Sequence, residues 1–353
     1  MKVTTKAHCS RIGGFKIQSV ILAAGRGERL SPITNTRPKS LIRLCGQSIL
    51  ERLLNTCSQV GINDFIIGLG YRGHQIQEHL KGSKFADNIH FVEVEKYEIG
   101  PLQTLTSCLE QVDDAPVLVL PSDLVTAEEL LQSFIDAKVN IGSLDAILGV
   151  MASGDKSQVH IDDSGTILGI GNDSGDYTQS LSSAMLLLIS QNFFSKLQTA
   201  LDDGCTRVSD ALNYWIHRGT KIGSEMVDGF CYDLDNPPTL LQATKFLLES
   251  KTVKPNGIHV PKGDVMEIGD AIHLSNGLSL YPGVSLKGPL YIDAGCIIEA
   301  SCEVGPSVSL DCRTIVKTNS VLSDMISVGN VTLPSNSHIQ NAVVYDNQVL
   351  RGL

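Results

Sequence analysis

The sequence predicts an α/β protein of two parts: a Rossmann-like, mixed and mostly parallel sheet, followed by a parallel β-helix. Strand-like and helical segments alternate over the first two-thirds of the chain, and a six-residue apolar period replaces the helical period after them. A chain of 353 residues is also too long for one ordinary core, so two domains are expected. We expect an N-terminal arm at residues 1–16, the sheet domain at 17–250, a linker at 251–257 and the β-helix at 258–353.

Short apolar runs and helical patterns alternate in the sheet domain. Strands are expected at 20–24, 64–69, 89–94 and 117–120, and helices between them at 49–60, 75–80 and 102–112. This order is typical of βαβ units, which build a parallel sheet covered on both faces. Residues 144–189 hold more strand-like runs, which indicates an inserted or mixed section. Helical patterns return at 208–217 and 239–250.

An apolar residue recurs at every sixth position in the β-helix domain. From position 268 to position 328, eleven successive places hold only Ile, Leu or Val. If about half of all residues are apolar, eleven in a row is roughly a one-in-two-thousand event. The period resumes at Leu333, Ile339 and Tyr345 after one residue is lost near Gly329. This pattern predicts a hexapeptide β-helix, whose strands bury their inward side chains against the coils above and below.

Composition and charge exclude several classes of protein. A formal charge of −10 argues against a nucleic-acid partner, which requires clustered Lys and Arg. The longest apolar stretches are far too short to span a membrane. The nine cysteines are odd in number and never spaced as C-x-x-C, which favours a reducing, cytoplasmic location over a disulfide framework or a zinc site. The first sixteen residues lack the apolar segment of a secretory signal, so we interpret them as an arm, with a transit peptide as the alternative.

Residues 20–41 carry the first candidate chemistry. A predicted strand ends just before Gly25 and Gly27, which allow the backbone to turn sharply and to present N–H groups to an anion. Arg29 offers a bidentate fork for phosphate oxygens, and Lys39 adds a second positive charge. The spacing does not match a dinucleotide fingerprint, and the Gly-Lys-Ser/Thr of a P-loop is missing. A phosphate-binding loop at the carboxyl end of a strand is therefore expected.

The same stretch closely resembles the sugar-nucleotide pyrophosphorylase family, whose signature is L-A-A-G-x-G-x-R-L-x-P-x-T followed by P-K-x-L. The matching residues are Leu22, Ala23, Ala24, Gly25, Gly27, Arg29, Leu30, Pro32, Thr34, Pro38, Lys39 and Leu41. The resemblance covers the first 250 residues. It implies a nucleotidyltransferase domain that condenses a nucleoside triphosphate with a sugar 1-phosphate, giving an NDP-sugar and pyrophosphate. An appended left-handed hexapeptide β-helix is also common in this family.

The resemblance implies roles for particular residues. Arg29 and Lys39 correspond to catalytic residues. The expected nucleotide-binding residues are Leu22, Ala23, Ala24, Gly25, Gly27, Glu95, Gly100 and Ser122. An ionised Glu95 only accepts hydrogen bonds, so it suits guanine or cytosine better than thymine and favours GTP or CTP. A solvent-facing glutamate at a strand end is the alternative.

Two aspartates are the expected ligands of Mg²⁺. Asp123 directly follows a predicted strand, where the family has Gly-Asp and this chain has Ser122-Asp123; an aspartate there is also a common helix N-cap. Asp233 lies in a stretch, residues 232–237, that resembles the W-x-D-x-x-T-P segment of the family. Mg²⁺ takes one or two carboxylates together with water and phosphate oxygens, so a pair from distant strands fits it.

The acceptor side departs from the family. The Glu-Lys-Pro segment that contacts the sugar phosphate is replaced by Gly169-Ile170-Gly171-Asn172-Asp173, and the strand after it, at 182–186, lacks its glycine. A cytidylyltransferase acting on phosphocholine or an inositol phosphate is therefore the nearest alternative. A catalytically silent subunit that senses nucleotide sugars is another, although all four candidate catalytic and metal-binding side chains are retained.

The β-helix is expected to form homo-oligomers, because coil edges and flat faces favour symmetric packing. Acyltransferase activity on this domain is a further possibility. Such sites need a histidine base between coils, and only His273 and His338 lie among the repeats, where we expect them at the surface.

Overall fold

The computed structural model describes residues 17–113, 116–138, 144–154, 157–171, 179–249, 265–268 and 271–351. By its internal contacts the chain divides into two compact units. Unit 1 contains the described residues up to Arg26 and those of Leu53–Cys231, and unit 2 contains Gly27–Arg52 and the described residues of Tyr232–Leu353. The arm expected at 1–16 and the linker expected at 251–257 lie outside the described residues, and the domain boundaries stay a prediction.

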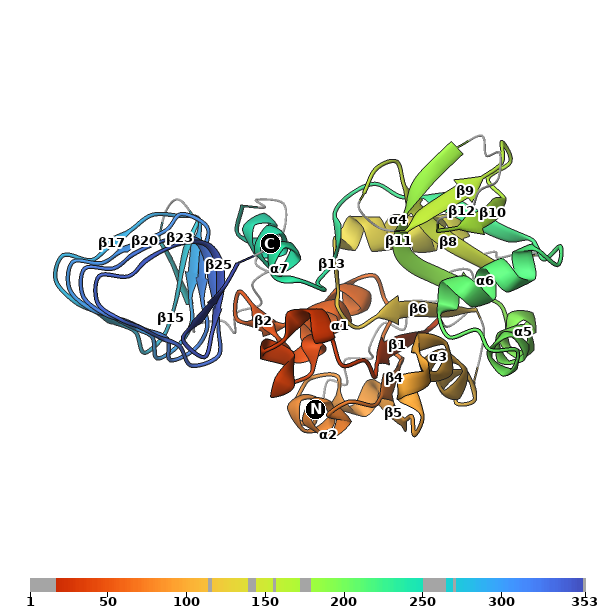
Figure 1. Ribbon diagram of the computed structural model, residues 1–353, viewed down its shortest axis with the longest axis horizontal. Helices are drawn as coiled ribbons and strands as arrows, with labels where there is room; N and C mark the ends of the chain where they lie inside the picture. Colours follow the sequence, from red (N-terminus) through yellow and green to blue (C-terminus); the bar gives the residue numbers. More distant parts are fainter. Residues whose placement is uncertain are drawn as a thin grey trace, which may run out of the picture. The chain divides into compact units, whose positions relative to one another are not determined.

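Unit 1 is built on a nine-stranded sheet with the order β10-β9-β11-β6-β1-β4-β5, in which β8 also pairs with β11 and β12 pairs with β8 (Figure 1). Its strands are β1 (Gln18–Ala23), β4 (Phe65–Leu69), β5 (Ile89–Glu93), β6 (Val117–Pro121), β8 (Ala146–Met151), β9 (Gln158–Ile161), β10 (Ile167–Ile170), β11 (Gln179–Ile189) and β12 (Ile222–Met226). β1 runs parallel to β4 and β6, and β4 runs parallel to β5. β11 is antiparallel to β6 and β8. The parallel core and the mixed section within 144–189 are both confirmed.

The helices of unit 1 bury their apolar faces against this sheet. They are α2 (Gly73–Leu80), α3 (Pro101–Leu109), α4 (Glu128–Lys138), α5 (Gln191–Asp202) and α6 (Val208–Ile216), while α1 (Ile49–Gln59) crosses the division between the units. Leu105 of α3 and Phe193 of α5 share one core with Val117 of β6. Among the described residues, no helix has the length and apolar character needed to cross a membrane.

The segment after Asp123 is a strand, not a helix. Leu124–Thr126 forms β7, and α4 begins only at Glu128. The alternative of Asp123 as a helix N-cap is therefore wrong, because a strand start places no row of unpaired helical N–H groups beside its carboxylate.

Unit 2 combines residues 27–52 and α7 (Pro237–Glu249) with a parallel β-helix, whose stacked coils are blue in Figure 1. The coils form three parallel ladders. The first contains β15 (Ile272–Ser275), β18 (Leu290–Ile292), β21 (Val308–Leu310) and the later parts of β23 (Val321–Val328) and β25 (His338–Tyr345). The second contains β16 (Ser279–Leu280), β19 (Ile297–Ile298), β22 (Ile315–Val316) and β24 (Thr332–Leu333). The third contains β17 (Ser285–Leu286), β20 (Glu303–Val304) and the first parts of β23 and β25.

The repeat of six residues sets the length of a coil. Leu290 pairs with Val308 in the next coil, eighteen residues on, which is three hexads. β14 (Val265–Ile268) and β26 (Gln348–Leu350) add antiparallel partners to β15 and β25. Of the two histidines among the repeats, both expected at the surface, His338 is exposed and His273 is half-buried. The predicted β-helix is confirmed.

Most of the predicted inward positions that the structure describes form the core of the β-helix. Leu286 is only half-buried against it, and Val328 and Tyr345 are buried outside it. Ile292, Ile298, Val304 and Leu310 are fully buried in a single cluster. Leu280 occupies the same hexad position but is 45% exposed. It lies in β16, at the end of the second ladder. Within the described part of the chain β16 pairs with β19 alone, so no described strand covers its other side.

The loss of one residue occurs earlier than predicted. Val304 pairs with Leu322, eighteen residues on, but Val308 pairs with Met325, only seventeen residues on. The corner between Leu322 and Met325 is therefore one residue shorter, and the prediction of a loss near Gly329 is wrong. The sequence does not reveal this change because Val328, which is also buried, is apolar and continues the six-residue period past the short corner.

Two variants at equivalent hexad positions test the burial pattern. Leu310→Ala removes a fully buried side chain from the stack, so we expect the free energy of unfolding to fall by about 2–5 kcal/mol. Leu280→Ala should cost less than about 1 kcal/mol because its side chain is largely hydrated already. Denaturant unfolding followed by circular dichroism measures both, and equal losses would contradict an end position for Leu280.

Candidate functional site

The carboxyl ends of three parallel strands bring several predicted residues together in unit 1. β1 lies between β4 and β6, so its carboxyl end is a topological switch point, where ligands of open α/β sheets bind. The N–H of Ser122 donates to the carbonyl of Leu22 at 3.2 Å, and the N–H of Tyr71 donates to the carbonyl of Ala24 at 2.9 Å. These bonds hold the loops after the three strands side by side. The predicted residues at this edge are Leu22, Ala23, Ala24, Gly25, Ser122 and Asp123.

The backbone at Gly25 is open. A Cβ built on this glycine would meet no atom within 4 Å, and the residue is exposed. Ala23 and Ala24 just before it are buried. At Gly70, in the neighbouring loop, a Cβ would collide with the ring of Tyr97 and lie 2.8 Å from the carbonyl of Ala24. A ligand can therefore approach the chain at Gly25, while the backbone beside it is closely packed.

Glu95 and Gly100 follow β5 at the same edge of the sheet. The N–H of Val94 donates to the carbonyl of Leu69 at 2.9 Å, which keeps this segment next to the loop after β4. Glu95 is exposed, as both of its predicted roles require. Gly100 has φ of 146°, and a Cβ there would lie 2.5 Å from the carbonyl oxygen of Thr206. Only glycine fits this turn into α3, so its contact with a nucleotide stays a prediction.

A second group of predicted residues lies in unit 2, where the signature stretch folds back on itself. Gly27 takes φ of 66°, and Thr34 Oγ1 donates to its carbonyl at 3.0 Å. Three short 3-10 turns follow, at Glu28–Leu30, Ile33–Asn35 and Lys39–Leu41. A Cβ at Gly27 would lie 3.0 Å from Lys39 Cβ, so this glycine allows the stem of Lys39 to pack against the turn.

Both predicted catalytic cations face an aspartate of the same unit. Lys39 Nζ lies 3.7 Å from Asp233 Oδ1, and Arg29 forms an ion pair with Asp235. The side chains of Lys39 and Asp233 are 12% and 17% exposed, whereas that of Arg29 is 73% exposed. Lys39 and Asp233 therefore form a sheltered pair, while Arg29 extends into solvent.

Sequence reasoning did not assign Asp235. The signal for it was available, because Asp233 and Asp235 stand two residues apart around Leu234, which is buried. The N–H of Asp235 donates to the carbonyl of Asp233 at 3.1 Å, which closes a tight turn and keeps the two residues close together. Two neighbouring carboxylates are thus presented to the cations of residues 27–52.

Asp123 and Asp233 have the chemistry that Mg²⁺ requires. Asp123 is half-buried beyond β6 in unit 1, and Asp233 is the last residue of β13 (Cys231–Asp233), in unit 2. Among the described residues no three His, Cys, Asp or Glu side chains gather into a metal-binding cluster. Mg²⁺ needs none, since water and phosphate oxygens complete its coordination. Asp233 already faces the positive charge of Lys39, so its carboxylate lies where a cation is accommodated. That Asp123 and Asp233 share one Mg²⁺ stays a prediction.

β11 is irregular on the expected acceptor side. Met185 takes φ of 60°, and the pairing of β11 with β8 shifts between Ser183 and Leu187. A non-glycine residue in this conformation costs about 1–3 kcal/mol, and such bulges are common beside active sites. The strand thus adopts a left-handed backbone without the family's glycine. Asn172 and Asp173, in the segment that replaces Glu-Lys-Pro, lie outside the described residues.

Comparisons with known proteins agree with this geometry. A family described as the MobA-like NTP transferase domain matches residues 19–212. A low-salt glycan biosynthesis nucleotidyltransferase from Haloferax volcanii is 24% identical over 248 residues, which cover 68% of this chain and 69% of that protein. The bifunctional protein GlmU from Methanocaldococcus jannaschii is 25% identical over 235 residues, which cover 66% of this chain and 55% of that protein. The chain therefore spans from 55% to 69% of the length of these two relatives.

A solved structure shares the fold. A proposed glucose-1-phosphate thymidylyltransferase from Bacillus anthracis, in complex with sucrose, superimposes with a TM-score of 0.58 at 20% identity. The match covers 68% of this chain and 98% of that one.

Two glycine-to-alanine variants distinguish a glycine that the fold requires from one beside open space that a ligand can occupy. Gly27→Ala places a side chain in the left-handed region and against Lys39, so we expect a loss of about 1–2 kcal/mol in the free energy of unfolding. Gly25→Ala meets no neighbour and should change stability by less than about 0.5 kcal/mol. Thermal unfolding of both variants measures the difference. A destabilised Gly25→Ala protein would show that this backbone is not open.

Proposed function

The chain belongs to the MobA-like NTP transferase domain family, and on that premise we propose that it condenses a nucleoside triphosphate with a sugar 1-phosphate to form an NDP-sugar and pyrophosphate. The observation that carries the proposal is the edge of the sheet in unit 1, where bonded loops after β1, β4 and β6 surround an open Gly25. The names of the relatives support the same class of reaction.

The proposed chemistry needs position and charge rather than a side-chain base. A phosphate oxygen of the acceptor attacks the α-phosphorus of the triphosphate, a new P–O bond forms, and the bond to the β-phosphate breaks to release pyrophosphate. A phosphate monoester with a second pKa of about 6 is already largely dianionic at neutral pH. Catalysis then depends on holding the two reactants in line and offsetting negative charge.

The residues of the chain divide these tasks in our proposal. The backbone from Leu22 to Gly25 holds the triphosphate, and Glu95 accepts hydrogen bonds from the base. Lys39 and Arg29 offset the charge that builds up on the departing pyrophosphate. Lys39 is held close to its place beside Asp233, whereas the exposed Arg29 can leave Asp235 for a phosphate.

We further propose that Asp123 and Asp233 hold Mg²⁺. When bound, the ion supplies positive charge to the phosphate oxygens of nucleotide and acceptor. Self-association through the β-helix also belongs to the proposal, and a strictly monomeric mass by light scattering at several concentrations would contradict it.

Pyrophosphate release over a grid of substrates tests the proposal. The purified full chain is given each common nucleoside triphosphate with hexose 1-phosphates, phosphocholine and an inositol phosphate. We expect release with a hexose 1-phosphate and with GTP or CTP, its loss on addition of EDTA, and its return with excess Mg²⁺. Release only with phosphocholine or an inositol phosphate would instead favour the cytidylyltransferase alternative. Binding of an NDP-sugar without release from any pair would favour a sensing subunit.

Removing either cation should slow the transfer. Arg29→Ala and Lys39→Ala are each expected to lower kcat by on the order of 10³-fold, because each loses a charge that offsets the leaving group. Lys245→Ala is the control, since this lysine is exposed on α7 and pairs only loosely with Glu249, at 3.8 Å. Steady-state kinetics with the best substrate pair measures all three. Full turnover by Arg29→Ala or Lys39→Ala would remove that residue from the mechanism.

A further inference from the structure

One outward face of the β-helix is covered. Side chains alternate along a strand, so Tyr291 and Ser309, in the middle of β18 and β21, point out of the first ladder. Each is nevertheless only 4% exposed. The outward residues of the third ladder, Ser285 and Glu303, are exposed. A segment of unit 2 therefore lies over the first ladder.

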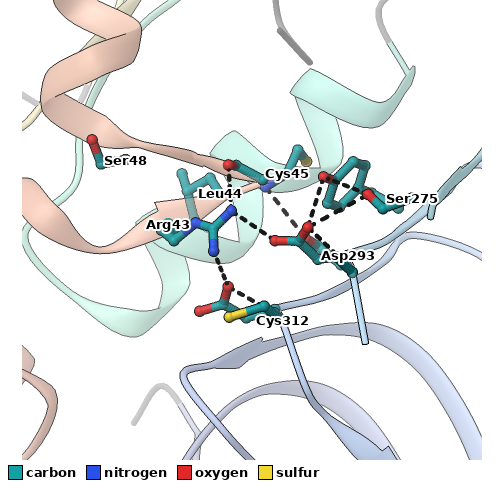
Figure 2. A network of polar contacts seen from close by, with 12 residues as sticks. Arg43, Leu44, Cys45, Ser48, Ser275, Asp293 and Cys312 are labelled. Carbon is teal, nitrogen blue, oxygen red and sulfur yellow. Dashed lines mark hydrogen bonds and ion pairs between the residues drawn. The ribbon is translucent and has the colours of Figure 1, made fainter. Parts of the chain in front are cut away.

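Residues 43–46 lie on this face (Figure 2). They form the first strand and the turn of a small hairpin, in which β2 (Arg43–Leu44) pairs with β3 (Gln47–Ser48). The N–H of Cys45 donates to Ser309 Oγ at 3.3 Å, and a Cβ on Gly46 would collide with the hydroxyl of Tyr291. Burial raises the pKa of the Cys45 thiol to about 11, so it stays protonated at neutral pH. The hairpin turn is thus packed directly on the ladder.

Arg43 joins two successive coils. One of its terminal nitrogens lies 2.7 Å from Asp293 Oδ2 and the other lies 3.2 Å from Asp311 Oδ1. Backbone N–H groups of Ala294 and Gly329 donate to these carboxylates at 2.7 Å each and fix their orientation. Burial by itself would lower the pKa of Arg43, but the charges of Asp311 and Asp293 outweigh it, so the pKa is raised.

A second anchor lies upstream. Thr36 Oγ1 and the hydroxyl of Tyr345 are 2.6 Å apart and share a hydrogen bond. The guanidinium of Arg37 lies over the same ring, 5.8 Å from its centre, at cation–π distance. Tyr345 ends β25, in register with Val328 of β23. The chain is therefore attached to the β-helix on both sides of residues 38–42.

Lys39 lies between the two anchors. The N–H of Leu41 donates to the carbonyl of Pro38, and that of Ile42 donates to the carbonyl of Lys39, each at 3.0 Å. Ile42 is fully buried. Only three residues separate Lys39 from Arg43, and two of them, Ser40 and Ile42, are buried, so a displacement of Arg43 is expected to move Lys39 as well.

We propose that Arg43 is a positioning residue, which bridges Asp293 and Asp311 and thereby holds the backbone of Lys39 beside Asp233. The β-helix then serves catalysis as well as assembly. Only the catalytic role of Lys39 in this proposal rests on the proposed function. The anchoring itself can be measured without turnover.

Hydrogen exchange tests the anchoring. Arg43→Gln removes the charge of the side chain but leaves a polar group, so we expect the amides of residues 39–46 to exchange at least about tenfold faster, as in a segment released to local opening. Residues 297–304 of the same β-helix should be unchanged. Lys317→Gln is the control, because it breaks an ion pair with Glu299 at 3.1 Å elsewhere on the β-helix. Unchanged exchange at residues 39–46 in Arg43→Gln would overturn the proposal. Asp293→Asn replaces Arg43→Gln if that variant does not fold.

A double-mutant cycle tests the link to Lys39. Arg43→Gln should lower kcat by about tenfold to a hundredfold, as expected for a displaced catalytic group. In a Lys39→Ala background, measured by single turnover with radiolabelled triphosphate, Arg43→Gln should lower the rate little further, because both changes act on the contact that Lys39 makes. Arg43→Lys should recover part of the rate. An equal cost in both backgrounds would refute positioning. Full turnover by Lys39→Ala would remove Lys39 from the mechanism, and an unmodified chain without turnover would refute the proposed function. In either case faster exchange would still establish the anchor.

Discussion

The pairing of cations in residues 27–52 with aspartates of the same unit is the interaction on which the candidate site depends. In the proposed reaction a chain with a formal charge of −10 binds anionic phosphates, so its few positive charges have to be concentrated and held in place. Three cations of this short segment meet carboxylates that come from far along the chain. The pairs are Arg29 with Asp235, Lys39 with Asp233, and Arg43 with Asp293 and Asp311.

The three pairs differ in how firmly they hold their cation. An exposed ion pair contributes about 0–1 kcal/mol, so Arg29 can exchange Asp235 for a phosphate at little cost. Lys39 is sheltered and its stem packs on Gly27, so it has less freedom to move. Arg43 is held by two carboxylates that backbone N–H groups orient. This order fits the roles proposed for the three residues: a mobile phosphate contact for Arg29, a fixed catalytic charge for Lys39 and a structural anchor for Arg43.

Local patterns in the sequence predicted the elements well. The strand–helix alternation located β1, β4, β5 and β6, and the hexads located the inward residues of the β-helix, because both follow from backbone periodicity. The glycines and cations of the signature were also recognisable, since they are contiguous.

Long-range pairing could not be predicted in the same way. Nothing near Arg43 indicates that Asp293 and Asp311 will face it, and hexad periodicity marks Tyr291 and Ser309 only as outward. Their burial depends on a segment far earlier in the chain. The predicted burial of Leu280 is wrong for a related reason, because a periodic pattern does not show where a ladder ends.

The choice of arginine at position 43 follows from the geometry of the ladder. Asp293 and Asp311 stand at equivalent places in successive coils, and neighbouring strands are about 4.8 Å apart. A planar guanidinium has two outer nitrogens and can place one on each carboxylate, as Arg43 does here. A lysine is a single point charge and cannot meet both with the same geometry. Two stacked aspartates would also repel each other without a shared cation, so the anchor that holds the Lys39 segment also stabilises the two coils on which it rests.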